Sequence, residues 1–198
     1  YIGLRDLITP GVDMWEVEEY VRRRCKEENF LPLQIGVDGA MMDYPYATCC
    51  SLNDEVAHAF PRHYILKDGD LLKVDMVLGG PIAKSDLNVS KLNFNNVEQM
   101  KKYTQSYSGG LADSCWAYAV GTPSEEVKNL MDVTKEAMYK GIEQAVVGNR
   151  IGDIGAAIQE YAESRGYGVV RDLVGHGVGP TMHEEPMVPN YGIAGRGL

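Results

Sequence analysis

Residues 175–186 read GHGVGPTMHEEP, a glycine-rich loop with two histidines, His176 and His183. Imidazole side chains bind first-row transition metals and can also protonate or polarise a reacting group. The glycines around them permit backbone conformations that other residues resist and let a ligand approach closely. A Gly-His-Gly stretch alone is better explained as a turn with surface histidines. The surrounding sequence must therefore decide whether this loop forms a site.

The composition is that of an ordinary globular protein. The chain has 198 residues, 44% hydrophobic and 24% charged, so we expect one compact unit, with two as the alternative. A net charge of −9 and a pI near 4.9 argue against a protein built mainly to bind nucleic acid. We see no apolar run of membrane-spanning length and no secretory signal, so we expect a cytoplasmic protein with reduced cysteines.

Hydrophobic periodicity predicts alternating helices and strands. We expect helices at 12–29, within 95–105, from a cap at Thr122 to about Ile142, and at 153–165. We expect strands at 33–37, within 47–60, at 71–78, 111–120 and 167–174. The polar stretch 79–110, bracketed by two Gly pairs, is interpreted as an insertion between strands. Its composition favours a surface excursion and is compatible with disorder.

Three groups of motifs in the chain resemble those of the methionine aminopeptidases, the type I branch in particular. The family patterns His-Gly-x-Gly, His-Glu-Glu-Pro and Pro-Asn-Tyr-Gly match residues 176–179, 183–186 and 189–192. SLNDEVAHAFP, at 51–61, resembles a segment that places an upstream family histidine on His58. LKDGDLLKVDMV, at 66–77, resembles a segment whose last aspartate is a metal ligand and falls on Asp75. The resemblance covers nearly the whole chain except 79–110.

The second metal-ligand aspartate has two candidates. In the family it usually follows the first by eleven residues, and Asp86 meets that count. The family aspartate is also followed by Ser or Thr, a short strand, a Gly and a long helix. This context fits Asp113, which precedes Ser114 and the strand that leads to Gly121. Strand alternation places Asp113 and Cys115 on one face. We therefore predict Asp113 as the ligand and Asp86 as a solvated loop carboxylate.

The resemblance implies an α+β pita-bread fold, in which two pseudo-symmetric halves place outer helices over a curved antiparallel sheet. The chain would be a single catalytic domain over 1–198, truncated at both ends, with 79–110 as an insertion. Family members carry two further metal-ligand glutamates beyond the Pro-Asn-Tyr-Gly segment, and one of them is the presumed general base. We expect those glutamates downstream of Leu198.

The activity implied by the resemblance is removal of the N-terminal methionine from nascent or short peptides. A hydroxide bridging two divalent ions would attack the first peptide carbonyl. Asp75, Asp113 and His176 would be metal ligands, and the metals would be Co, Mn, Fe or Zn. His183 would stabilise the charge developing on the scissile group, and His58 would contact the amide on the leaving side.

A pocket for the methionine side chain is part of the same expectation. Tyr44 and Cys49 match family positions that line this pocket, and Met182, just before His183, would contribute. Core or loop packing explains each of these three residues about equally well.

Two other functions remain open on the same fold. One is an Xaa-Pro peptidase of the aminopeptidase P or prolidase kind, and the other is a non-catalytic binding protein. The expected partners are peptides with N-terminal Met, with ribosome association as a further expectation. We expect no direct nucleic-acid binding, no membrane contact and a monomer.

Overall fold

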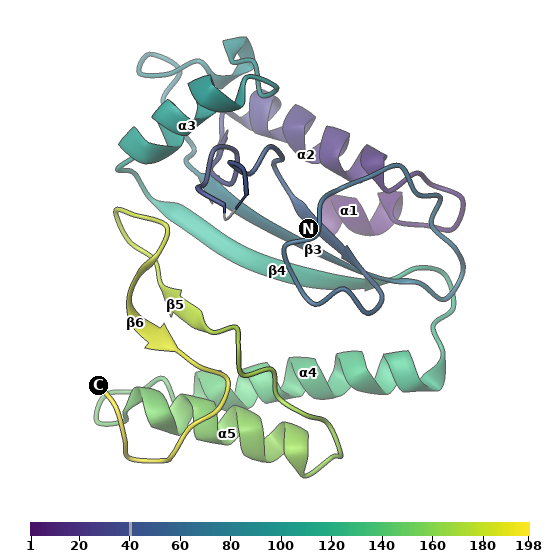
Figure 1. The fold of residues 1–198 in the computed structure, drawn as a ribbon, viewed down its shortest axis with the longest axis vertical. Helices are drawn as coiled ribbons and strands as arrows, with labels where there is room; N and C mark the ends of the chain where they lie inside the picture. Colours follow the sequence, from purple (N-terminus) through teal and green to yellow (C-terminus); the bar gives the residue numbers. More distant parts are fainter. Residues whose placement is uncertain (40) are drawn as a thin grey trace. The chain divides into compact units, whose positions relative to one another are not determined.

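The computed structural model describes residues 1–39 and 41–198, and it divides them into two compact units (Figure 1). Unit 1 consists of Tyr1–Pro123 and Gly179–Met182. Unit 2 consists of Ser124–Val178 and His183–Leu198. No helix among the described residues is long and apolar enough to cross a membrane.

A four-stranded antiparallel sheet forms the centre of unit 1. Its central strand, β3 (Leu71–Gly79), pairs along its whole length with β4 (Leu111–Ala119). The other two strands, β1 (Leu31–Pro32) and β2 (Cys49–Leu52), pair with opposite ends of β3. The predicted strand at 71–78 is therefore confirmed, and the predicted strands within 47–60 and at 111–120 are confirmed in shorter form.

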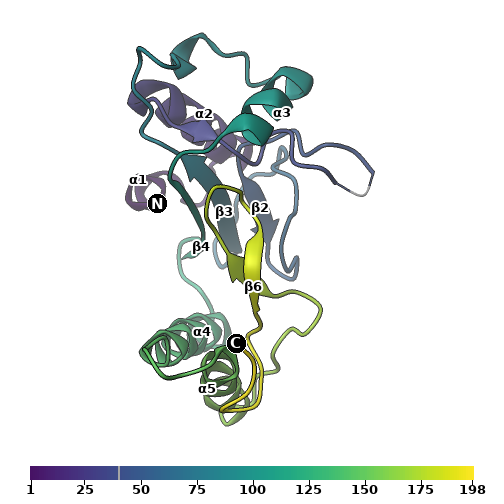
Figure 2. The ribbon, with the colours of Figure 1, turned by 90° about the vertical axis from the view of Figure 1, so that its left-hand side faces the viewer.

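Two helices, α1 (Ile2–Leu7) and α2 (Trp15–Glu28), lie on one face of this sheet (Figure 2). Val74 and Met76 of β3 point toward them into a buried core, because alternate strand residues share a face. The helix predicted at 12–29 begins slightly later, at Trp15. Asp13 accepts a hydrogen bond from the Trp15 amide, and Glu16 accepts one from the Asp13 amide, while Met14 occupies the N-cap position without a side-chain cap.

The stretch 79–110, interpreted as a surface excursion compatible with disorder, forms helices in the structure. It contains a 3-10 helix, η1 (Val89–Lys91), and the α-helix α3 (Val97–Ser106), which confirms the helix expected within 95–105. Val89 and Met100 are fully buried in the unit 1 core. A few apolar residues, spaced among many polar ones, supply the buried surface that holds this stretch against the core.

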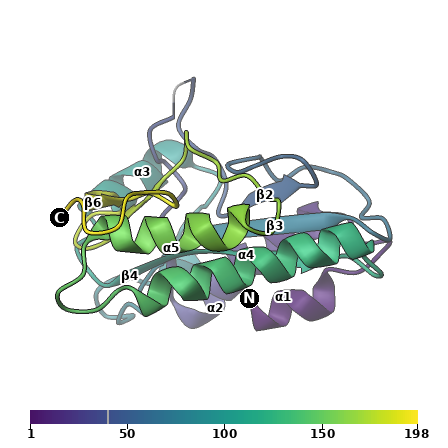
Figure 3. The ribbon, with the colours of Figure 1, turned by 90° about the horizontal axis from the view of Figure 1, so that it is seen from below.

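Unit 2 contains two helices, α4 (Glu125–Glu143) and α5 (Ile151–Glu163), which pack side by side (Figure 3). A Cβ on Gly141 would lie 2.7 Å from the Ile158 side chain, so glycine lets the helices approach closely. A short hairpin, β5 (Gly175–Gly177) and β6 (Glu184–Val188), completes the unit.

Two predicted strands and one predicted helix cap were wrong. The strand expected at 33–37 is a turn, and pairing stops at Pro32. The strand expected at 167–174 is irregular, because only 175–177 finds a partner in β6. The cap of α4 is Ser124, whose hydroxyl accepts from the Val127 amide at 3.2 Å, rather than Thr122.

Candidate functional site

The two predicted carboxylate ligands lie on one face of neighbouring strands in unit 1. Asp75 of β3 pairs with Cys115 of β4, and Asp113 pairs with Val77. Residues two apart on a strand share a face, so Asp75 and Asp113 are diagonal neighbours, about 7 to 8 Å apart in such a ladder. Both side chains are partly exposed. This face is opposite to the one that α1 and α2 cover.

Asp86 lies elsewhere in unit 1, in an exposed turn where its amide donates to the Ala83 carbonyl at 2.9 Å. Ser85 donates a hydrogen bond to its carboxylate at 3.2 Å. The turn is not part of the β3–β4 ladder. The ladder therefore brings Asp75 and Asp113 onto one face and leaves Asp86 outside it.

Two of the three residues expected to form the substrate pocket, Tyr44 and Cys49, lie together next to Asp75. Cys49 of β2 pairs directly with Asp75, and its thiol interacts with the Tyr44 hydroxyl. That hydroxyl donates to the Thr48 carbonyl at 3.0 Å, and the Ala59 carbonyl is 3.4 Å away. Burial raises the pKa of the Cys49 thiol to about 11, so it stays protonated at neutral pH.

His58 is held close to this group by the loop after β2. The amide of Cys50 donates to the Ala59 carbonyl at 2.9 Å, and the Ala59 amide donates to the Ser51 hydroxyl at 3.3 Å. His58 precedes Ala59, is exposed and has a φ of 59°, a left-handed conformation that is uncommon outside glycine. A strained backbone at a polar exposed residue is typical of functional positions.

In unit 2, the ring centroids of His176 and His183 lie 4.6 Å apart. Nδ1 of His176 is 2.9 Å from the Gly177 carbonyl oxygen, which can only accept, so Nδ1 carries the proton and donates. A neutral imidazole protonated on Nδ1 has its lone pair on Nε2. Metal-binding histidines are commonly oriented by such a bond to a backbone carbonyl. A Cβ on Gly177 would lie 2.5 Å from the Glu185 carbonyl, so the loop requires glycine there.

Met182 belongs to unit 1, where its side chain packs against the hydrophobic core at partial exposure. Packing therefore accounts for it as well as a pocket does.

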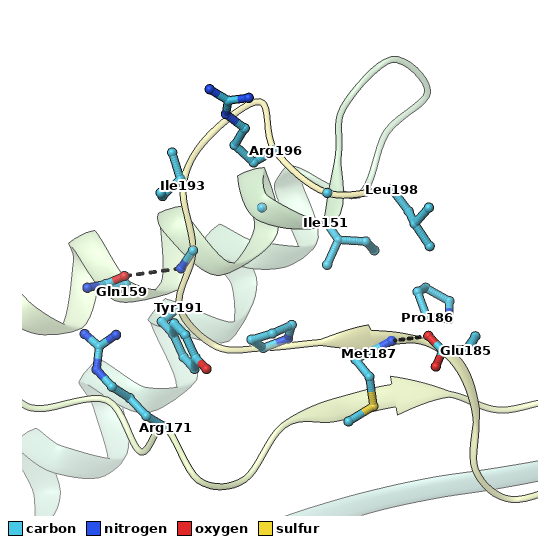
Figure 4. A pocket seen from close by; sticks show the side chains of 14 residues that line it. Ile151, Gln159, Arg171, Glu185, Pro186, Met187, Tyr191, Ile193, Arg196 and Leu198 are labelled. Atoms are coloured by element: carbon cyan, nitrogen blue, oxygen red, sulfur yellow. Dashed lines mark hydrogen bonds between the residues drawn. The ribbon is translucent and has the colours of Figure 1, made fainter.

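A groove of about 750 Å³ in unit 2 contains none of the predicted site residues (Figure 4). The segment 189–198 forms one side of it. Gln159 of α5 accepts from the Gly192 amide at 3.3 Å, and the Arg171 guanidinium lies 4.8 Å from the Tyr191 ring centroid. A Cβ on Gly155 would lie 2.3 Å from the Tyr191 carbonyl, so the Pro-Asn-Tyr-Gly segment packs directly on α5. This contact gives that motif a structural role.

The donor chemistry of the predicted ligands fits divalent metal ions. Asp75 and Asp113 supply hard carboxylate oxygens on one face, and His176 supplies an imidazole nitrogen. Within residues 1–39 and 41–198, no three His, Cys, Asp or Glu side chains are grouped closely enough to hold an ion. The fit therefore rests on the types of donor and on the carboxylate pair.

The chain matches the sequence profile of metallopeptidase family M24 over residues 2–81 and 102–197. The chain belongs to this family. Family membership implies metal ions in the active protein. The profile leaves 82–101 unmatched, and these residues form a large part of the segment interpreted as an insertion.

Relatives found by sequence include methionine aminopeptidases. The protein of Clostridium acetobutylicum is 41% identical over 189 residues, which are 95% of this chain and 63% of that protein. The methionine aminopeptidase 1 of Bacillus subtilis is 34% identical over 194 residues. The chain spans about two thirds of the length of the curated relatives that it matches.

The solved structures agree on the α+β pita-bread fold. A methionine aminopeptidase from Streptococci, described as having a novel structural motif, is 99% identical with a TM-score of 0.90, covering 100% of this chain and 69% of that one. The Thermotoga maritima methionine aminopeptidase is 34% identical with a TM-score of 0.79, covering 99% of this chain and 67% of that one. A prolidase from Pyrococcus horikoshii, 20% identical with a TM-score of 0.65, shares the fold alone.

Sequence reasoning missed two groups near the pocket. Glu18 of α2 is fully buried and accepts from the amides of Ala47 and Thr48 at 2.8 and 3.0 Å. Its partner Arg22 is four residues later, a spacing that pairs charges on a helix and is visible in the sequence. Lys101, which contacts the segment before Tyr44, carried no sequence signal because its partners are distant in the chain.

Proposed function

We propose that the complete protein is a metal-dependent methionyl aminopeptidase. The observation that carries the proposal is the diagonal placement of Asp75 and Asp113 on one face of the β3–β4 ladder. The similarity to methionine aminopeptidases over nearly the whole chain supports the same activity. The substrate would be a peptide with a free N-terminal methionine.

The residues of this chain would contribute in distinct ways. Asp75 and Asp113 would hold two divalent ions, of Co, Mn, Fe or Zn, through carboxylate oxygens, and His176 would ligate through Nε2. The bound ions would supply Lewis acidity, which polarises a carbonyl and lowers the pKa of a water molecule.

The two remaining histidines would act on the peptide itself. His183 would donate a hydrogen bond to the first peptide carbonyl and stabilise the negative charge that develops there. His58, held by the loop that returns to β2, would contact the amide on the leaving side.

The first residue of the substrate would enter a pocket beside the carboxylates. Tyr44 and Cys49 interact with each other and present an apolar, polarisable surface suited to a thioether. Met182 would add a further thioether contact. Removal of a single residue follows if the free α-amine is required for binding at the metal site.

The test is release of methionine by the full-length protein. Loaded with Mn or Co, it should release free Met from Met-Ala peptides, and chelation of the metal should stop the release. Peptides that begin Xaa-Pro serve as the comparison, since a prolidase-like enzyme would prefer them. Absence of Met release with confirmed metal occupancy would contradict the proposal.

A further inference from the structure

The segment 82–101, which the family profile leaves unmatched, contains η1 and the first half of α3. We call it the inserted segment. The residues that lead to the predicted pocket, 34–39 and 41–49, we call the pocket segment. Both belong to unit 1. Several contacts join the two segments.

The inserted segment is anchored to the end of α2. Asn29, the left-handed residue that ends α2, donates through Nδ2 to the carbonyls of Ile82 at 2.6 Å and Leu87 at 2.8 Å. Its Oδ1 accepts from the Val89 amide at 2.9 Å. Asn29 is 3% exposed, so these bonds are shielded from water. The buried polar groups therefore rely on one another as hydrogen-bond partners. The base of the inserted segment is therefore fixed.

From this base, α3 lies against the first part of the pocket segment. Nζ of Lys101 forms ion pairs with Asp38 and, at 2.9 Å, with Asp43. Thr104 donates through its hydroxyl to the Ile35 carbonyl at 2.8 Å. A Cβ at Gly36, which has a φ of +88°, would lie 2.4 Å from Cα of Lys101. The helix backbone therefore approaches the pocket segment closely, and one cation joins two of its carboxylates.

A second set of contacts reaches the later part of the pocket segment. Arg22 donates to the Asn95 side chain of the inserted segment at 2.9 Å and to the Pro45 carbonyl at 3.0 Å. Its Nε also binds Glu18, which accepts from the Thr48 amide and hydroxyl. The inserted segment thus contacts the pocket segment directly before Tyr44, through Lys101, and is linked to it after Tyr44 through Arg22.

We propose that the inserted segment is a brace for the pocket that would receive the first substrate residue, and that Lys101 is its main positioning residue. The assignment of the pocket rests on the proposed function. Asp38 and Asp43 would repel each other without a cation between them. Lys101 therefore closes the turn whose backbone bonds, Gly36 amide to Tyr44 carbonyl and Tyr44 amide to Val37 carbonyl, are both 2.8 Å long.

The direct test is hydrogen exchange at the Gly36 and Tyr44 amides of the full-length protein. Lys101→Met removes the charge and keeps most of the aliphatic stem, so we expect exchange at these amides to become about fivefold faster. Lys102→Met is the matched control on the same helix, because Lys102 is exposed and its Glu98 partner is 3.9 Å away. Lys101→Arg should restore slow exchange, and Asp43→Asn should speed it from the other side of the pair.

Steady-state kinetics provide a second measurement, which tests the brace independently of the proposed activity. In Lys101→Met, KM for Met-Ala peptides should rise about fivefold with kcat nearly unchanged, because the pocket wall moves while the reacting groups stay in place. Unchanged exchange at Gly36 and Tyr44 would overturn the brace. The brace would also be overturned if exchange in Lys101→Met became faster by the same factor throughout unit 1 and the Tm fell. If exchange responds but the parent protein releases no methionine, the brace stands and the proposed function fails.

Discussion

At the scale of single residues, Asp113 and Asp86 offer a direct comparison. Asp113 shares a sheet face with Asp75, whereas Asp86 lies in an exposed turn. We expect Asp113→Ala to lower metal-dependent turnover of the complete protein by at least about 100-fold, since a lost ligand costs more than a lost supporting group. Asp86→Ala should leave turnover nearly intact. Steady-state rates and metal content by elemental analysis check both, and equal loss in the two variants would refute the assignment.

Glu18 makes a second prediction at this scale, one that concerns stability. Its buried carboxylate binds Arg22 and the backbone of Ala47 and Thr48. Glu18→Ala would leave the guanidinium and two buried amides without their acceptor, so the free energy of unfolding should fall by about 3–5 kcal/mol. Urea denaturation measures the loss.

Glu27→Ala, on the same helix, is the control for this measurement. Glu27 forms only exposed ion pairs, with Arg23 and Arg24, so its loss should cost at most about 1 kcal/mol. Similar losses in both variants would show that burial of Glu18 does not matter.

At the scale of elements, the start of α4 shows how local sequence signals can compete. Thr122, Pro123 and Glu125 satisfy the rules for a helix start, yet Ser124 provides the cap. The Thr122 amide instead donates to the Asp68 carboxylate at 2.7 Å, a distant contact that sequence rules cannot include. Tertiary contacts thus decide between two caps of similar intrinsic strength.

Ser124→Ala should therefore lower the free energy of unfolding by about 1 kcal/mol, because the Val127 amide loses its acceptor. Thr122→Ala should change stability by less than about 0.5 kcal/mol. Thermal or urea denaturation compares the two variants. A larger loss of stability in Thr122→Ala than in Ser124→Ala would indicate that Thr122 caps the helix, as the sequence predicts.

Strand ends illustrate the same limit. The alternation of Leu72, Val74 and Met76 predicts β3 well, because these three residues share a face and are all buried. The segments 33–37 and 167–174 have strand-like composition, but among the described residues only the backbone of Leu33 bonds to that of a sheet strand, through its amide to the Val77 carbonyl at 2.9 Å. A strand depends on pairing as well as on its own residues, and pairing is non-local.

At the scale of the whole molecule, acid sensitivity follows from hydrogen-bonded carboxylates in both units. The pKa of Asp13 is lowered by hydrogen bonds from His63 and the Trp15 amide, and that of Asp153 by the amides of Arg150 and Gly195. A carboxyl group whose pKa is lower in the folded state than in the unfolded state stabilises the fold at pH values above its unfolded-state pKa. That stability is lost as pH falls through the folded pKa.

The Tm should accordingly fall as the pH is lowered from 6 to 3, with most of the change below about pH 4. Asp13→Asn and Asp153→Asn do not titrate, so each variant should have a lower Tm at pH 6 and a smaller fall on acidification. Calorimetry across this range provides the measurement. A Tm independent of pH would contradict the contribution of these carboxylates.

The candidate site residues can be named from the sequence, whereas the contacts of the inserted segment cannot. Asp75, Asp113, His176 and His183 lie in motifs whose residue types are set by chemistry, and the motifs are contiguous. The contacts of Lys101 and Arg22 join residues far apart in the chain, and nothing in their local sequence marks them. Motifs therefore indicate reacting groups, whereas supporting groups require the three-dimensional structure.

The β3–β4 ladder has a consequence for how this chain can change in length. Its last pair joins Gly79 to Leu111, and the Gly80 amide donates to the Gly110 carbonyl at 3.1 Å, so the excursion between them leaves and returns at one point. Lengthening a loop with closed ends adds only about 0.6 kcal/mol for each doubling. Natural variation can thus add or remove whole helices here without shifting the register that places Asp75 and Asp113. The junction where Gly80 bonds to Gly110 is a suitable position for grafting a reporter peptide.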